Sequence, residues 1–283
     1  AFNKAYEGEV TELVNCPDVT WFGLEIDGEK IYPERSCLKS FERKLDIFSG
    51  ELVIRYVFAL GEKGEVLVEN RRFASMVQSG LFAQTLRVQF LGDKSGQVKV
   101  KTGINGQITN SGVSHFHTST ARVYEKEVME IRSELENGTV TEATGCKVVR
   151  GVQEEKEFNL KRRSVYGTYV IVPEDKEVIF EKVTLADQGE NGITTEERKQ
   201  MLTAALKKGY DVLWAEQQMK MKEFWDVTRI HVDGMSEAEE AAVCFAQYHI
   251  LGMTPWHTNE SSIAAKGPVS YTHLRAHETS AHL

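Results

Sequence analysis

The sequence predicts a mainly β protein, with a large antiparallel β-sandwich in its N-terminal part and a short helical region after it. From Val10 to about Ala186, short runs of alternating apolar and polar residues are separated by turn signals, which is typical of antiparallel strands with one buried face. From Trp214 to Gly267 the spacing of apolar residues changes from two to nearly four, which indicates helices. The Gly-rich segment Asp187–Ile193 separates the two patterns and marks the predicted domain boundary.

Length and composition are those of an ordinary globular protein. The 283 residues suffice for one large or two ordinary domains, and the contents of hydrophobic (41%) and charged (27%) residues are typical of soluble proteins. The net charge of −8, without a basic stripe, argues against a nucleic-acid surface. The one tight basic run, Lys161–Arg163, is expected to be a solvated strand face. No apolar run approaches the roughly 20 residues that a membrane-spanning helix needs, so no membrane association is expected.

The cysteine pattern favours a reducing compartment. The four cysteines, Cys16, Cys37, Cys146 and Cys244, lie far apart and form no C-x-x-C pair, so neither a zinc module nor a small disulfide scaffold is indicated. We therefore expect reduced thiols and a cytoplasmic location. The chain begins at Ala1 in the middle of a pattern and its first methionine is Met76, which suggests a fragment of a longer gene.

Two β-hairpins are predicted near the N-terminus. Asp27-Gly28 lies between two short strand-like runs, and this pair supplies the positive φ angles that a two-residue type I′ turn needs. The runs Glu51–Leu60 and Glu65–Ala74 flank Gly61–Gly64 and form the second hairpin.

Further strand-like runs bring the total to about a dozen, which is too many for one small sandwich and predicts two large stacked sheets. Asn137-Gly138 is a turn between two of these runs. They are Leu81–Phe90, Gln97–Ile104, Val113–Val123, Arg122–Leu135, Thr139–Val149, Ser164–Pro173 and Glu177–Ala186.

Three polar features of this region are ambiguous. His115 and His117 are spaced to point the same way from a strand, so a metal or sugar contact is possible, but without a third ligand nearby we expect exposed or loop histidines. Asp46 and Gly50 are expected to form a turn rather than a metal or phosphate site. The pair Arg71-Arg72 is expected to donate ion pairs on a sheet face.

Three helices are predicted after the boundary. Thr194 and Glu197 make a capping box that opens the first helix, which Gly209 ends. In the second, Trp214 and Trp225 share one face with Met221 between them. The third opens with the capping box of Ser236 and Glu239, is expected to end at Gly252, and has an apolar stripe made of Ala238, Ala242, Phe245 and His249.

The helical region also carries a family resemblance. The pattern W-x10-W-D-x3-I-x-V-D-G at Trp214–Gly234, followed by S-S-I-A-A-K-G at Ser261–Gly267, resembles the entry to the catalytic domain of glycoside hydrolase family 65. Four pieces of the family's N-terminal domain precede it in order, so the resemblance covers residues 10–267. These pieces are Glu12–Asp18, Lys44–Leu52, Arg71–Met76 and Thr102–Gly112.

The resemblance implies an architecture. Residues 1–190 would form an antiparallel β super-sandwich like that of galactose mutarotase, residues 191–234 the linker helices, and residues 235–267 the truncated start of an (α/α)6 barrel. Val269–Thr279 reads VSYTHLRAHET, the translation of a common transposase sequencing adapter, so residues 268–283 are interpreted as an artefact. The three histidines of that tail, His273, His277 and His282, are therefore not expected to bind a metal.

The resemblance also implies a function for the parent protein. It would be an inverting phosphorylase that converts an α-linked glucose disaccharide and phosphate into glucose 1-phosphate and a sugar, as a homodimer without metal or organic cofactor. Two alternatives stay open: a hydrolase of the same family, such as a trehalase or kojibiose hydrolase, and a carbohydrate-binding module without catalysis.

Phosphorolysis needs a carboxylic acid for the leaving oxygen and a bound phosphate as the nucleophile. In the family both lie beyond the end of this chain, so no catalytic residue is expected in it. Trp225 and Lys266 are the candidate substrate-binding residues, the tryptophan by stacking on a sugar, although a core position for Trp225 is the alternative. The acidic candidates of this region are Glu223, Asp226 and Asp233. Asp226 and Asp233 could hydrogen-bond sugar hydroxyls, but acidic residues at helix ends and turns are expected to be caps.

Overall fold

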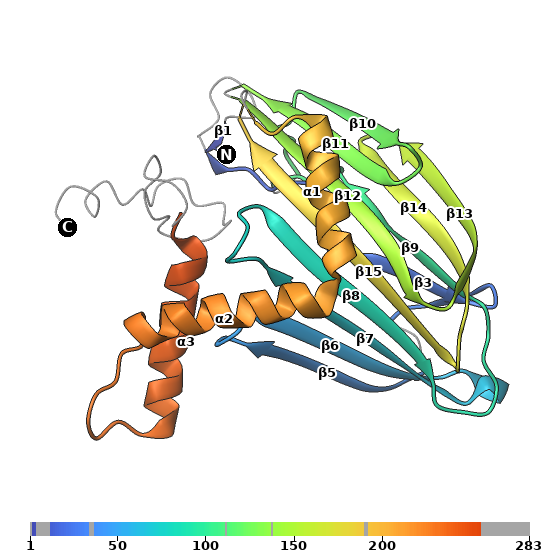
Figure 1. Cartoon of the computed structure of the whole chain (residues 1–283), viewed down its shortest axis with the longest axis horizontal. Coiled ribbons are helices and arrows are strands. Elements are labelled where there is room, and N and C mark those ends of the chain that lie inside the picture. Colours follow the sequence, from blue (N-terminus) through green and yellow to red (C-terminus); the bar gives the residue numbers. More distant parts are fainter. Residues whose placement is uncertain are drawn as a thin grey trace.

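The fold is a sandwich of two antiparallel sheets with three helices on and beside the larger sheet (Figure 1). This computed structural model describes residues 2–3, 12–33, 37–110, 112–136, 138–189 and 192–255. The candidate residue Lys266 and the tail 268–283 lie outside these ranges.

The larger sheet has eight strands, and each hydrogen-bonded neighbour runs antiparallel. In spatial order the strands are β10 (Thr118–Tyr124), β11 (Val128–Leu135), β12 (Gly138–Arg150), β15 (Glu177–Gln188), β8 (Leu81–Phe90), β7 (Glu65–Ala74), β6 (Glu51–Ala59) and β5 (Leu38–Asp46).

The smaller sheet has five strands and stacks on one face of the larger sheet. Its order is β13 (Val152–Lys161), β14 (Ser164–Val172), β9 (Val98–Asn105), β3 (Phe22–Ile26) and β4 (Glu29–Ile31), and a separate short pair joins β1 (Phe2–Asn3) to β2 (Glu12–Leu13). The predicted architecture of two stacked sheets is confirmed.

Both predicted hairpins are confirmed. Asp27 and Gly28 have φ angles of 47° and 81°, and Ile26 pairs directly with Glu29, as a two-residue type I′ turn requires. Strands β6 and β7 pair across a short 3₁₀ turn, Gly61–Lys63.

The later strands required three corrections. The run Arg122–Leu135 is not continuous, because Glu125 and Lys126 adopt positive φ angles and form the tight turn between β10 and β11. Strand β10 starts at Thr118, which is later than the predicted Val113. Strand β13 was not predicted, since its mostly exposed, charged residues lack a clear alternation. Within the basic run, Lys161 and Arg162 are exposed as expected, but Arg163 is half-buried and donates to Ser114.

The main core fills the space between the two sheets. It includes residues of both, such as Val100 and Tyr169 of the smaller sheet and Val88 and Phe180 of the larger one. The rings of Tyr169 and Phe180 meet edge to face with centroids 4.8 Å apart, so aromatic contacts bridge the sheets. We call the face of the larger sheet toward this core the inner face.

Helix α1 (Thr195–Lys208) lies on the opposite, outer face of the larger sheet (Figure 1). Its predicted capping box of Thr194 and Glu197 is confirmed, and Gly209 follows its last residue. Leu202 and Ala205 pack on outer-face residues of β12 and β15 in a second apolar cluster. A Cβ atom on Gly145 would lie 2.8 Å from Leu206 Cδ1, so this glycine allows the helix to approach the sheet closely.

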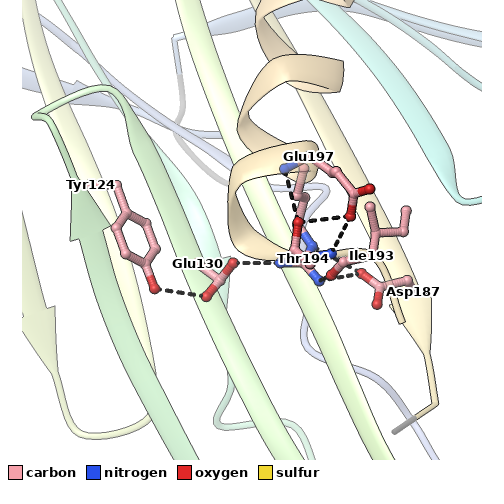
Figure 2. Close-up of polar contacts among 7 residues, drawn as sticks. Tyr124, Glu130, Asp187, Ile193, Thr194 and Glu197 are labelled. Carbon is pink, nitrogen blue, oxygen red and sulfur yellow. Dashed lines mark hydrogen bonds and ion pairs between the residues drawn. The ribbon is translucent and has the colours of Figure 1, made fainter. Parts of the chain in front are cut away.

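A buried ion pair fixes the start of α1 (Figure 2). The Arg198 side chain is 4% exposed and donates to Glu130 at 2.8 Å, to Asp187 at 2.9 Å and to the Ile193 carbonyl at 2.7 Å. Tyr124 donates to the other oxygen of Glu130 at 3.1 Å. Strands β11 and β15 and the segment before α1 are thereby joined at one guanidinium group.

Helix α2 (Tyr210–Thr228) starts directly after Gly209, whose φ of 80° turns the chain away from α1. The Tyr210 backbone N–H donates to Glu181 at 3.0 Å, and its hydroxyl donates to Glu51 at 2.9 Å. The guanidinium group of Arg71 lies over the Tyr210 ring and pairs with Glu51 at 2.7 Å, which confirms the ion pair predicted for this arginine.

Helix α3 (Glu237–Met253) crosses α2 beyond the edge of the sheet (Figure 1). The capping box of Ser236 and Glu239 is confirmed, but the helix continues one residue past Gly252. The predicted apolar stripe is wrong as a packing face, because all four of its residues, Ala238, Ala242, Phe245 and His249, are exposed. The face packed on α2 contains Cys244, Tyr248 and Leu251 instead.

One end of the sandwich interior is polar. Lys182 is 0% exposed, and its ammonium group donates to Thr102 Oγ1 at 2.8 Å and to the carbonyls of Val19 and Gly103 at 2.5 and 3.0 Å. Burial lowers the pKa of Lys182 to about 8. Nearby, burial and then the charge of Asp18 raise the pKa of Glu142 to about 8. Within the described residues, Glu142 Oε2 has no hydrogen-bond partner.

Replacement of Arg198 by methionine is expected to destabilise the fold strongly. Glu130 and Asp187 would keep buried carboxylates without their cation, and breaking such a pair costs about 3–5 kcal/mol. The free energy of unfolding from urea titrations measures this cost. Lys199→Met is the matched control on the same helix, because the partners of Lys199 are exposed and such a pair contributes about 0–1 kcal/mol. Equal losses in the two variants would contradict a structural role for the Arg198 contacts.

Glu142→Gln is expected to flatten the pH dependence of stability. The native carboxyl, with a pKa of about 8, stays protonated over a range where the unfolded carboxyl, with an ordinary pKa of 4.5, has lost its proton. Unfolding therefore releases a proton, and stability falls as pH rises from about 5 to 7.5, by at most roughly 1.4 kcal/mol per pH unit. Urea titrations across this range should show a smaller decline in the variant. The exposed Glu155→Gln is the control, and parallel profiles for the native chain and Glu142→Gln would refute the prediction.

Candidate functional site

Two neighbouring cavities lie where the larger sheet meets the last two helices. One has a volume of about 450 Å³ and is bounded by the β5–β6 turn, the β7–β8 loop, α2 and α3. The other has a volume of about 700 Å³ and lies mainly between α2 and α3. Met76, Leu251 and Thr254 line both. Volumes of this size suit small ligands, so the junction is the candidate site in the described part of the chain.

The first wall is the turn between β5 and β6. Asp46 accepts hydrogen bonds from the Phe48 backbone at 3.0 Å and the Ser49 hydroxyl at 2.6 Å, while Gly50 has a φ of 76°. The predicted turn is therefore confirmed, and its Asp46 carboxylate is occupied by local bonds rather than free for a ligand.

Gln217 ties the walls together. It is 1% exposed, its side-chain oxygen accepts from the Met76 backbone at 2.8 Å, and its amide donates to the Ser49 carbonyl at 3.1 Å. One side chain of α2 thus satisfies a backbone N–H group in one loop of the sheet and a backbone carbonyl group in another. Gln217 was not predicted from the sequence, although a glutamine on the apolar stripe between Trp214 and Met221 was the available signal.

Trp225 lies inside the contact between α2, α3 and the β5–β6 turn. Its side chain is 6% exposed and clusters with Met221 and Cys244. Its ring centroid is 5.2 Å from those of Phe48 and Phe224. This geometry is that of a core residue, and a sugar would reach the ring only if the cluster opened. The role of Trp225 in substrate binding stays a prediction.

The shared face predicted for α2 is confirmed, but its two tryptophans belong to different clusters. Trp214 contacts Phe73 of the sheet at a centroid distance of 5.6 Å. Trp225 contacts the turn and α3. The same face therefore joins the sheet at one end of α2 and the third helix at the other.

The acidic candidates do not converge on the cavities as a catalytic group. Glu223 lines the larger cavity but pairs with Lys220 at 2.8 Å, and Asp226 pairs with Lys222 on the exposed side of α2. Asp233 lies in an exposed turn before Gly234, as expected. The expectation of a helix cap is wrong for Asp226, because it lies inside α2, as Glu223 does.

The histidine pair lies in the loop before β10 rather than in a strand. This location agrees with the expectation of exposed or loop histidines: His117 is exposed, whereas His115 lies in the loop with its side chain buried, at 2% exposure. Among the described residues, no group of three or more His, Cys, Asp or Glu side chains is arranged to hold a metal ion. All four cysteines are free thiols. In the same part of the chain, none of the helices combines the length and the apolar composition of a membrane-spanning segment.

Known proteins with sequences similar to this chain are carbohydrate-active enzymes. A family model described as "Glycosyl hydrolase family 65, N-terminal domain" matches residues 3–224. A kojibiose phosphorylase of Halothermothrix orenii is 30% identical over 93% of this chain and 35% of its own length. A nigerose phosphorylase of Lachnoclostridium phytofermentans is 24% identical over 94% of this chain and 38% of its own length. The chain thus spans about a third of these relatives.

The fold has a solved counterpart. The solved structure of a protein from the human microbiome, described as a kojibiose phosphorylase, superposes on this chain with a TM-score of 0.73. The two sequences are 14% identical, and the match covers 89% of this chain and 33% of the other. At this identity the likeness concerns the fold alone, while the family model covers most of the chain. The chain belongs to glycosyl hydrolase family 65, and most of it is the N-terminal domain of that family.

Proposed function

We propose that this chain is the N-terminal part of an inverting phosphorylase that cleaves an α-linked glucose disaccharide with phosphate. The observation that carries the proposal is the match of the chain, over more than nine-tenths of its length, to relatives named kojibiose and nigerose phosphorylases. The products would be glucose 1-phosphate and the released sugar. The parent would use no metal or organic cofactor, and it would act in the cytoplasm as a homodimer.

The chemistry supports assigning catalysis to the rest of the parent. Phosphorolysis needs a carboxylic acid that protonates the leaving oxygen and a site that holds phosphate on the other side of the sugar. At the junction, Glu223 forms an exposed ion pair. Away from the junction, Glu142 has a raised pKa but is enclosed in the sandwich. Neither arrangement suits a general acid facing a cavity. The general acid and phosphate site are therefore proposed to lie outside this chain.

Helix α3 supports a continuation of the fold next to the junction. Its packed face contains Cys244 and Leu251, while Phe245 and Ile250 on its other sides are 50% and 52% exposed. Apolar side chains on more than one side of a helix favour enclosure by further structure. We propose that residues 235–267 begin the catalytic (α/α)6 barrel, that residues 191–234 link it to the sandwich of residues 1–190, and that residues 268–283 are the adapter artefact.

The proposal predicts the stereochemistry of the parent reaction. The gene extended beyond Gly267 should yield an enzyme that releases β-glucose 1-phosphate from kojibiose or nigerose only when phosphate is present, since inversion of an α bond gives the β anomer. Proton NMR of the product distinguishes the anomers. Release of free glucose without phosphate would identify the hydrolase alternative, and binding without turnover would identify the carbohydrate-binding module.

The purified 283-residue chain is expected to release no glucose 1-phosphate from either disaccharide. A coupled assay with the extended enzyme as the positive control measures this. Turnover by the short chain would contradict the assignment of catalysis to the missing portion. In the extended enzyme, Lys266→Met tests the proposed substrate contact, and a raised KM with unchanged kcat is expected for a residue that only binds substrate.

A further inference from the structure

Part of the inner face of the larger sheet is not covered by the smaller sheet. On the central strands, inner-face residues such as Val66 and Val88 are 0% exposed. On the edge strand β5, Phe41 is 56% exposed, and its cross-strand partner Tyr56 of β6 is only partly buried. The uncovered area therefore begins where β6 and β5 extend past the core.

Two arginines point toward this area. On β7, Val66 and Val68 face the core, so Arg72, four residues after Val68, has its side chain on the same face. On β5, Arg43 lies two residues after Phe41 and opposite Ile54, which shares the face of Tyr56. Phe41, Arg43, Tyr56 and Arg72 define what we call the arginine face.

Neither guanidinium group forms an ion pair within the described residues. By contrast, Arg55 of β6 and Arg71 of β7, on the outer face, pair with glutamates. Burial, and next the positive charge of Arg43, lower the pKa of Arg72. The negative charge of Asp18 raises this pKa, but by less, so the net change is a lowering. A half-buried cation that is not paired costs free energy, and a bound anion would relieve that cost.

The groups around the arginines suit a sugar. The Phe41 and Tyr56 rings lie 5.2 Å apart at 35°, and Tyr56 stacks on the buried Phe58 at 5.8 Å. The exposed Phe41 ring at the outer end of this row therefore adjoins the cations. Gln84 is the cross-strand neighbour of Arg72 and is 1% exposed. Its amide donates to the Thr20 carbonyl at 2.9 Å, but its side-chain oxygen has no partner within the described residues. Because that oxygen is itself buried, it is an unsatisfied polar group beside Arg72 and not a contact open to a ligand on the surface.

We propose that the arginine face binds a phosphorylated sugar. The two guanidinium groups would contact the phosphate, whose charge of up to −2 matches two cations, and Phe41 would lie against the pyranose ring. A carboxylate sugar offers only one negative charge and fits less well. The site belongs to the sandwich alone, so it does not depend on the function proposed for the parent protein.

The test is isothermal titration calorimetry of the purified 283-residue chain with glucose 6-phosphate, which measures the dissociation constant. Arg43→Gln should weaken binding about tenfold, the effect of losing one charge-assisted contact of about 1.5 kcal/mol. Lys44→Gln is the matched control, since it removes the same charge from the next residue on the opposite face of β5, and it should leave the affinity within about twofold. Arg43 is exposed, so its variant is expected to fold normally.

Three further titrations define the ligand class. Phe41→Ala should weaken the binding of glucose 6-phosphate but leave the affinity for inorganic phosphate unchanged. Glucuronate and methyl α-glucoside should bind to the native chain more weakly than glucose 6-phosphate does. Equal effects of Arg43→Gln and Lys44→Gln, or no detectable binding of glucose 6-phosphate, would overturn the proposal. Binding of glucuronate as tight as that of the phosphate sugar would overturn the phosphate assignment, and inorganic phosphate binding as tightly as glucose 6-phosphate would overturn the role of the sugar.

Discussion

The enclosure of β12 and β15 on both faces is the constraint from which the arrangement of the helices follows. Their inner faces carry the core shared with the smaller sheet, and their outer faces carry Ala143 and Leu185 beneath α1. A strand buried on both sides needs a cover on both sides. Helix α1 provides the outer cover, and Arg198 fixes its first turn through buried carboxylates that would be costly to leave unpaired. The turn at Gly209 then sets the direction of α2, and the apolar face of α2 determines where α3 can pack.

Local chemistry explains which parts of this fold were predictable from the sequence. The Asp27-Gly28 turn and the capping boxes at Thr194 and Ser236 depend on residues close together in the chain, and all three were found where predicted. The Glu125–Lys126 turn was missed because neither residue is a usual turn former, yet both adopt positive φ angles. Strand β13 was missed because its position at the edge of the smaller sheet leaves most of its side chains exposed. Edge strands place weaker demands on hydrophobic alternation than central strands do.

The candidate site was less predictable, because it is formed by contacts between distant segments. Trp225 was correctly placed on the same face of α2 as Met221, but periodicity alone does not reveal that Phe48, from a turn far away in the chain, closes over its ring. Gln217 forms hydrogen bonds with two loops that are distant in sequence: Met76 is 141 residues away and Ser49 is 168 residues away. The error in α3 has the same origin. A helix with apolar residues on several sides offers more than one stripe, and the choice between them depends on which neighbour is present.

The cations of the inner face show how structural and binding roles differ on one sheet. Lys182 and Arg72 both neighbour Gln84, one on each side, and both have pKa values lowered chiefly by burial. Lys182 is completely enclosed, and its three N–H donors meet three oxygen acceptors, so its hydrogen-bonding capacity is satisfied within the fold. Arg72 has five donors and, within the described chain, no carboxylate at ion-pair distance, and it is only half-buried at the border of the uncovered area. A cation that only stabilised the sandwich would be expected to resemble Lys182. The lack of an ion pair at Arg72 among the described residues therefore favours a ligand from solution over a purely structural role.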